Sequence, residues 1–370
     1  MNNPIWYFVF FSLLIVLLHY FNKIIQFTSI VEGNQLSQLD GLRGILAISV
    51  VFHHSLIMYN YFIIEKWVLP FSSFYILLGQ VSVSIFFMIT GFLFGLKLFD
   101  KDFNTLVFLK SRVKRIIPHQ IFSVIISFFV ILLIDNFGLY TSLTDLIVVF
   151  FKWFSYGYFG QPLINNNLYS GVIETVYWTL RDEWLFYLSL PFLFLIRKKI
   201  FQSNNKYFII TLFILFLITR NNFVLLFFIG IFIAYLKISN IQGNKYILLI
   251  VSSISLLAIF VVYDGAYHRT VAILLGVIFF SIVNGVFLYS FLQNKILQFL
   301  GQISYSIYLL HNIVVFILFY FVHTYCKSII DISLFEYLMI LFAILSLTIL
   351  LSFFTYKFIE HKFYFRRIKK

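Results

Sequence analysis

Residues 44–62 read GILAISVVFHHSLIMYNYF, an apolar run interrupted by two histidines. A helix that crosses a membrane needs about 20 apolar residues, which is close to the length of this run. The rest of the chain agrees, because 62% of its residues are hydrophobic and only 11% are charged. A water-soluble domain carries about 25% charged residues. We therefore expect the chain to fold in lipid rather than in water.

Further apolar runs predict an all-α fold, a polytopic transmembrane helical bundle of about 10–11 spanning helices. The predicted spans lie near residues 5–22, 43–60, 74–98, 118–135, 176–196, 206–219, 222–237, 246–263, 270–291, 301–323 and 335–356. The segment 143–154 is shorter and carries Lys152, so we expect it to be re-entrant or interfacial.

The positive charges predict an orientation. With the N-terminus outside, 21 of the 27 Lys and Arg residues fall in cytoplasmic connections or in the C-terminal tail. This asymmetry follows the positive-inside rule. It predicts a multi-pass protein of the cell membrane with a cytoplasmic C-terminus. It also explains the net charge of +13 without a nucleic-acid partner.

Ionisable side chains on three predicted spans lie at similar depth. At about 1.5 Å per residue, His54 lies roughly 16 Å beyond Arg43 at the inner edge of its span. His311 lies roughly 15 Å into its own span, and Glu183 lies roughly 21 Å from Arg197. Ionisable groups inside a membrane are costly and often functional, so we expect the three to meet in one cavity. The alternative is that each histidine only bonds to a neighbouring helix.

Two polar residues share a helix face with His311. Ser304, Tyr308 and His311 are spaced i, i+4 and i+7, which places them on one side of a helix. His53 points about 100° away from His54. Both cannot face one site, so we interpret His53 as structural.

A basic segment precedes the span expected at 118–135. It contains Arg112, Lys114 and Arg115, and the two arginines share a face if the segment is helical. Arginine binds phosphate groups through paired hydrogen bonds, so this is a candidate anion site. On charge alone, chain orientation and binding of anionic lipid heads are the stronger explanation. Pro118 fits the first turn of the following span.

Five sequence blocks together resemble a known family. They are LDGLRGILAISVVFHH (39–54), SVSIFFMITGFLFG (82–95), SRVKRIIP (111–118), WTLRDEWLFYLSLP (178–191) and FLGQISYSIYLLH (299–311). In this order they are similar to the motif blocks of the acyltransferase-3 family, which are bacterial integral-membrane acyltransferases. The spacing in the first block selects Arg43 and His54. The departures are Thr90 in place of serine, Asn312 after the last histidine, and EHKF at 360–363 without the family's proline.

The resemblance implies a domain boundary and a reaction. Residues 39–370 would form the acyltransferase domain, and residues 1–38 an extra N-terminal transmembrane helix with a cytoplasmic link. The family moves an acyl group, most often acetyl, from cytoplasmic acyl-CoA to a hydroxyl of an outward-facing glycan or lipid-linked saccharide. Acyl-CoA would be the donor substrate and not a bound cofactor, and we expect no metal. Whether transfer also needs a separate periplasmic protein stays open.

The resemblance also implies roles for single residues. His54 would act as general base on the acceptor hydroxyl or accept the acyl group itself, and both roles need the neutral imidazole. His311 and Glu183 would complete the catalytic group, with Glu183 orienting a histidine or binding the acceptor. An interfacial aromatic belt is an equal alternative for the aromatic residues. The remaining roles are phosphate binding by Arg43, Arg112, Lys114 and Arg115, hydrogen bonding to the oxyanion by Ser304 and Tyr308, and stacking on a sugar by Tyr177, Trp178 and Trp184.

Other classes of protein stay open. A lipid-linked glycan or polysaccharide exporter without acyl-transfer chemistry would ignore acyl-CoA. The membrane-bound O-acyltransferases also use a buried histidine, but their surrounding blocks differ. A purely structural or signalling membrane protein would not require polar groups at one depth.

Overall fold

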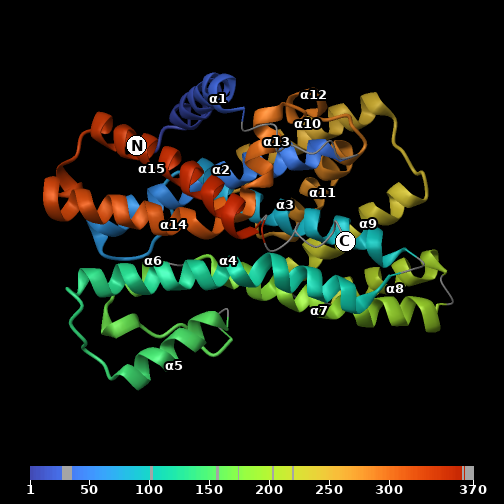
Figure 1. Cartoon of the computed structure of the whole chain (residues 1–370). Helices are drawn as coiled ribbons and strands as arrows, with labels where there is room; N and C mark the ends of the chain where they lie inside the picture. Colours follow the sequence, from blue (N-terminus) through green and yellow to red (C-terminus); the bar gives the residue numbers. More distant parts are fainter. Residues whose placement is uncertain are drawn as a thin grey trace.

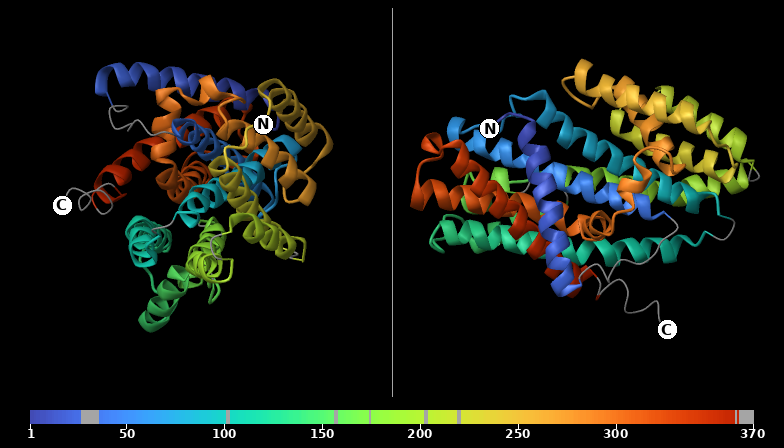
Figure 2. Two further views of the ribbon diagram at one scale, coloured as in Figure 1. Left: turned by 90° about the vertical axis from the view of Figure 1, so that its right-hand side faces the viewer. Right: turned by 90° about the horizontal axis from the view of Figure 1, so that it is seen from above.

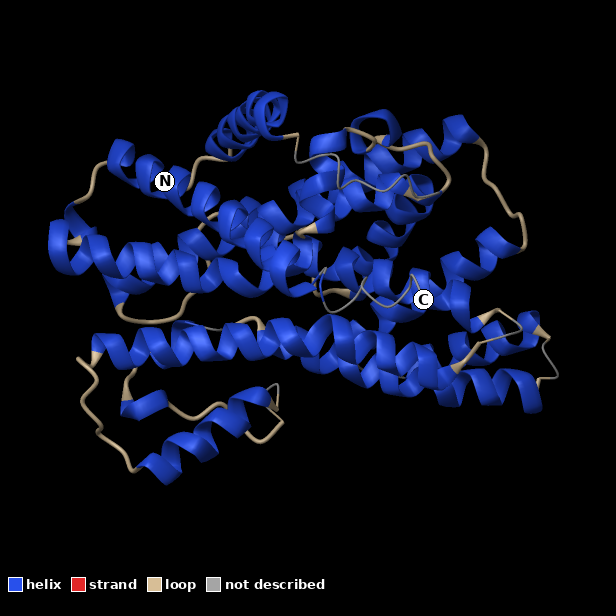
Figure 3. Ribbon diagram, in the orientation of Figure 1, coloured by secondary structure: helices blue, strands red, loops and turns tan. Residues whose placement is uncertain are grey.

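The computed structural model describes residues 1–26, 36–100, 103–155, 158–173, 175–201, 204–218, 221–360 and 362. Every regular element among these residues is a helix or a helical turn (Figures 1 and 3). The helices are α1 (Ile5–Ile25), α2 (Ser37–Ile64), α3 (Ser73–Leu98), α4 (Thr105–Ile134), α5 (Leu143–Phe154), α6 (Ser170–Ile173), α7 (Tyr177–Lys199), α8 (Asn205–Ile218), α9 (Asn222–Ile238), α10 (Lys245–Val262), α11 (Arg269–Val283), α12 (Tyr289–Leu292), α13 (Lys295–Gln302), α14 (Ser304–Phe321) and α15 (Leu334–Thr355). Short helical turns lie at Ile164–Asn166, Val322–Cys326, Ile329–Asp331 and Tyr356–Glu360.

The predicted membrane bundle is confirmed. Among the described residues, seven helices are long and apolar enough to cross a membrane, namely α1, α2, α3, α4, α10, α14 and α15. Helices α8, α9 and α11 are apolar but shorter, and α7 carries Arg181, Asp182 and Glu183. Each predicted span overlaps one of these helices, and the shorter segment at 143–154 is α5. The span expected at 270–291 is too long, because α11 ends at Val283 and the short α12 follows it. The chain is a multi-pass membrane protein.

One predicted boundary is wrong in a way that affects the site. The span expected at 118–135 begins at Thr105, so the basic segment is part of α4 and Pro118 lies inside the helix. Asn104 caps α4, because its side chain accepts a hydrogen bond from the backbone N–H three residues later at 3.0 Å. Residues with good helix propensity follow without a breaker as far as the proline. The two arginines of the segment therefore lie on a rigid helix.

Helix α2 lies at the centre of the bundle and packs against α3, α13 and α14 (Figure 1). Two glycines bring it into backbone contact with the C-terminal part of the chain. A Cβ atom at Gly41 would lie 1.9 Å from the carbonyl oxygen of Leu292, and one at Gly301 would lie 1.8 Å from that of Asp40. Such distances exclude any side chain, so only glycine fits. The first and last of the five sequence blocks are therefore in direct contact.

Helices α4 and α7 lie side by side on one flank of this core, and α5 lies outside them (Figures 1 and 2). Helix α7 contacts α3, and α4 contacts α14. Side chains from α2, α3, α4, α7 and α14 thus meet in the interior.

Helix α1 runs across the bundle rather than along it (Figure 2). Its buried side chains are Tyr7, Leu14 and Leu18. The hydroxyl groups of Tyr7 and Ser49 share a hydrogen bond of 3.0 Å, which ties α1 to the middle of α2. The domain boundary at residue 38 stays a prediction, because most of the link before it lies outside the described residues, as does most of the basic C-terminal tail.

Candidate active site

Two histidines meet between α2 and α14. His54 Nδ1 lies 3.0 Å from His311 Nε2. His311 is fully buried, whereas His54 is half-buried and lines a cavity. Each ring lies about three helical turns from the glycine contacts between α2 and the segment before α14. Those contacts therefore fix the two rings at the same depth.

The hydrogen bonds around the two rings define their tautomers. His311 Nδ1 lies 3.1 Å from the carbonyl oxygen of Ile307 and 2.7 Å from that of Tyr308. A carbonyl oxygen only accepts, so His311 Nδ1 carries a hydrogen and its Nε2 presents a lone pair to His54. His54 Nδ1 must then donate, which agrees with the carbonyl oxygen of Val50 at 3.2 Å from it. The lone pair of neutral His54 is on Nε2, the nitrogen that a general base needs.

The residues next to the two histidines form hydrogen bonds that link helices. His53 Nδ1 donates to the carbonyl oxygen of Tyr75 at 2.8 Å, which links α2 to α3. Asn312 Nδ2 donates to the carbonyl oxygens of Val172 and Ile173 at 2.8 and 3.1 Å. The asparagine that departs from the family pattern thus holds α6 against α14.

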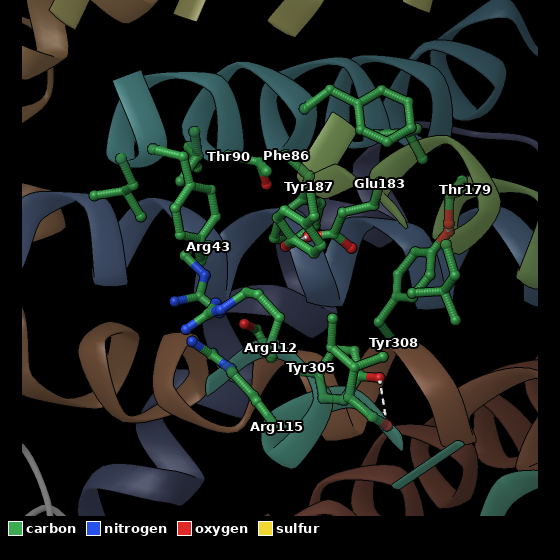
Figure 4. A pocket seen from close by; sticks show the side chains of 18 residues that line it. Arg43, Phe86, Thr90, Arg112, Arg115, Thr179, Glu183, Tyr187, Tyr305 and Tyr308 are labelled. Atoms are coloured by element: carbon green, nitrogen blue, oxygen red, sulfur yellow. Dashed lines mark hydrogen bonds between the residues drawn. The ribbon is translucent and has the colours of Figure 1, made fainter. Parts of the chain in front are cut away.

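One cavity collects positive charge, and we name it the arginine cavity. It has about 890 Å³ of empty volume. Arg43, Arg112 and Arg115 extend their guanidinium groups toward one another in it (Figure 4). The three guanidinium groups offer many hydrogen-bond donors to an anionic ligand, and nearby carboxylates offset part of their charge.

Protein groups hold each of these arginines in place. Arg115 Nε lies 3.2 Å from Oε1 of the buried Glu360, and Arg43 Nη1 lies 3.6 Å from Asp40 Oδ1. The guanidinium of the third arginine lies 4.9 Å from the ring centroid of Phe94, a favourable cation–π geometry. The arginines are therefore ordered before any ligand arrives.

Glu183 lies in the arginine cavity and not beside the histidines. Its carboxylate accepts a hydrogen bond from the hydroxyl of Tyr187. The expected meeting of His54, His311 and Glu183 in one cavity is therefore not observed. The depth of Glu183 was counted from Arg197, which is buried and donates to backbone carbonyl oxygens at 3.2 and 3.1 Å instead of marking the membrane edge.

A second cavity lies further along α2 and α3, and we name it the histidine cavity. It has about 630 Å³ of empty volume and is lined by His54, Trp178 and also His53. The expectation that His53 and His54 cannot both face one site is therefore wrong, because the cavity reaches around α2 far enough to contact both rings.

Sequence reasoning missed three residues of the histidine cavity, Trp67, Gln80 and Tyr267. Trp67 lies next to His54, with 6.1 Å between the two ring centroids. For the two aromatic residues, Trp67 and Tyr267, the sequence offered one signal: each lies a few residues beyond the end of a predicted span.

Tyr308 and Val83 line both cavities. The hydroxyl groups of Tyr308 and Thr179 share a hydrogen bond of 2.7 Å. We name these three residues the dividing wall. Ser304 lies on the arginine side of it, and its buried Oγ has no hydrogen-bond partner among the described residues.

Three residues expected in the site lie elsewhere. Lys114 is exposed on α4. Tyr177 is buried and donates a hydrogen bond to Ser123 Oγ at 3.2 Å. Trp184 packs against Tyr187 with ring centroids 6.0 Å apart. Successive helical residues point about 100° apart, so these side chains face away from the cavities that their neighbours line.

The fold and the site define a class of protein. An all-α membrane bundle encloses a basic cavity beside a histidine with an available lone pair, and within the described part of the chain no group of three or more His, Cys, Asp or Glu side chains could hold a metal ion. Such a site suits group transfer in which a histidine acts as general base. The chain belongs to the acyltransferase-3 family, whose model, described as an acyltransferase domain, matches residues 36–357. The resemblance found in the sequence is thus confirmed.

Relatives in Staphylococcus aureus carry names that agree with this family. The proteins named "Putative O-acetyltransferase" in strains COL, MSSA476 and MRSA252 are 26% identical to the chain over 386 residues. The match covers 92% of this chain and 59% of each relative, so the chain spans about 59% of the length of these relatives. No solved structure matches the chain.

Proposed function

We propose that this chain is a membrane O-acyltransferase. It moves an acyl group from cytoplasmic acyl-CoA to a hydroxyl of an outward-facing glycan or lipid-linked saccharide. Acetyl is the acyl group that we propose first. The observation that carries this proposal is the pair of cavities that share the dividing wall, with fixed arginines in one and His54 in the other.

The arginine cavity is the donor site of the proposal. Arg43, Arg112 and Arg115 bind the phosphates of acyl-CoA through charge-assisted hydrogen bonds. Glu183 does not touch the donor's phosphates in this scheme. Its negative charge attracts the arginines and positions them. The thin arm of the donor runs toward the dividing wall, where the unpaired Ser304 Oγ hydrogen-bonds to one of its amides. The basic residues of α4 support a cytoplasmic position for this cavity.

The histidine pair supplies the base. The acceptor oxygen attacks the thioester carbon while His54 Nε2 takes the hydroxyl proton. The bond from His54 Nδ1–H to His311 Nε2 holds the ring in this tautomer and strengthens as His54 becomes positively charged. The resulting oxyanion accepts a hydrogen bond from the Tyr308 hydroxyl, which gives up its hydrogen bond with Thr179. The carbon–sulfur bond then breaks, and the CoA thiolate takes the proton from His54.

The histidine cavity is the acceptor site. Trp67 and Trp178 offer ring faces for a sugar, and Gln80 offers an amide. Tyr267 lies in the connection between α10 and α11, and burial raises the pKa of its hydroxyl. The hydroxyl therefore stays a neutral hydrogen-bond donor at neutral pH.

The test compares two adjacent histidines in cells that lack the gene. Cells that express the wild-type chain should regain one acyl increment in the mass of their envelope glycan. His54→Ala should not restore it, although the protein inserts at normal levels. His53→Asn, which can keep the hydrogen bond to Tyr75, should restore it. An acyl increment produced by His54→Ala would contradict the proposed base.

A further inference from the structure

An apolar groove lies between α8, α9, α10 and α11, away from the active site. It has about 1550 Å³ of empty volume. Its walls carry only apolar side chains and Gly276, and include Ile209, Phe213, Leu225, Phe232, Leu248 and Phe280. None of its lining residues lines the arginine cavity or the histidine cavity.

One end of the groove is basic. Helices α8 and α10 begin at this end, and α9 ends there. Each of the three helices carries a lysine one turn beyond a lining residue, and residues three or four apart share a helix face. The pairs are Lys206 with Ile209, Lys237 with Ile233, and Lys245 with Leu248.

These lysines have no acidic partners among the described residues. Each is exposed or half-buried, and no ion pair includes any of them. The segments 197–206 and 237–245 contain no Asp or Glu. Three lysines without an acidic partner among the described residues therefore lie one helical turn beyond lining residues of the groove.

We propose that this groove binds one acyl chain of an anionic phospholipid, with the lipid phosphate at the three lysines. The apolar walls accept any hydrocarbon chain, so the groove alone does not distinguish one lipid from another. The head group makes the distinction, because each lysine near an anionic head strengthens binding about fivefold. Three lysines, with part of their effect screened by salt, favour an anionic over a zwitterionic lipid by about tenfold or more. The site is independent of acyl transfer.

The test is native mass spectrometry of the purified full-length protein in detergent. Phosphatidylglycerol and phosphatidylethanolamine with identical acyl chains are added in separate titrations. We expect the wild-type protein to retain phosphatidylglycerol at about tenfold lower lipid concentration. Equal retention of the two lipids would overturn the proposal.

Variants locate the site. Changing Lys206, Lys237 and Lys245 together to glutamine should remove the preference. The matched control removes the same charge elsewhere, by changing the exposed Lys110, Lys295 and Lys357 to glutamine, and should keep the preference. Loss in both triple variants, or in neither, would show that the groove is not the site.

A groove-filling variant separately tests whether the lipid's acyl chain lies in the groove. Ile273 lines the groove and is exposed on α11, so Ile273→Trp can fill part of the groove without displacing the buried core. This variant should retain neither lipid at the wild-type level, while its unfolding midpoint in lipid-free detergent stays within a few degrees of wild type. Wild-type retention by this folded variant would place the lipid elsewhere.

Discussion

Replacing His311 with leucine removes the nearer acceptor of the His54 Nδ1–H, at 3.0 Å. It leaves the backbone carbonyl oxygen of Val50 at 3.2 Å, which does not lie in the direction of the lost partner. His311 is fully buried, so water does not replace the lost partner. A hydrogen bond to a group that becomes charged is worth about 1.5–3 kcal/mol. Because His54 gains its charge only during the reaction, we expect kcat to fall about 10- to 100-fold. The KM for acyl-CoA should stay within about twofold of wild type, because the donor phosphates bind the arginines in a separate cavity.

The assay measures transfer of radiolabelled acetyl from acetyl-CoA to envelope glycan by the protein in liposomes. His311→Gln is the matched variant, since its side-chain oxygen can reach the position of the lost Nε2 and accept from His54. It should keep more activity than His311→Leu, and both variants should keep a cooperative thermal unfolding transition. A folded His311→Leu protein with wild-type kcat would refute the role of the histidine pair, and equal losses in the two variants would refute the hydrogen-bond explanation.

Three further predictions follow from the same geometry. Arg112→Ala with Arg115→Ala should raise the KM for acyl-CoA about 10- to 100-fold and leave the acceptor KM nearly unchanged, and an unchanged donor KM in steady-state kinetics would leave these arginines a role in topology alone. Trp178→Ala should raise the acceptor KM about five- to tenfold through lost ring contact, whereas Trp184→Ala, outside both cavities, should change it less than about twofold; similar values for the two variants would argue against stacking. Asn312→Leu removes two buried hydrogen bonds and should destabilise the protein by about 1–3 kcal/mol, seen as a lower unfolding midpoint in detergent, and a wild-type midpoint would contradict this.

The depths of His54 and His311 could be predicted because both were counted from one place in the fold. Arg43 and Gly301 lie at the same crossing, where Gly301 contacts the carbonyl oxygen of Asp40. Equal counts along two helices from one crossing give equal depths. The contact itself was invisible in the sequence, so the agreement depended on the choice of reference residues.

Glu183 shows where the same counting fails. Arg197 has the sequence pattern of a residue at the membrane edge, since two lysines follow it. It is instead buried against the backbone carbonyl oxygens of Phe99 and Asp100, the two residues that follow α3. A single sequence does not distinguish a solvated arginine from one that folds back onto the protein, so the expected depth was wrong.

The missed residues lie where a sequence carries no periodic signal. Trp67 and Tyr267 belong to connections between helices, and which cavity they line depends on how the helices pack. Glu360 opens the closing block, which departs from the family pattern at Lys362, yet its carboxylate lies 3.2 Å from Arg115 and is buried. Such a pairing joins residues from α4 and the far end of the chain, and it becomes visible only in three dimensions.

The dividing wall has a consequence for the cell as a whole. Two water-accessible spaces that met end to end would form a hole in the membrane, and protons and ions would flow through it and drain the gradients that power the cell. In this structure the side chains of Tyr308 and Val83 stand between the spaces. Under the proposed function, an acyl group would cross the dividing wall while the barrier to ions stays closed, so an acceptor outside the cell would be modified without loss of membrane potential.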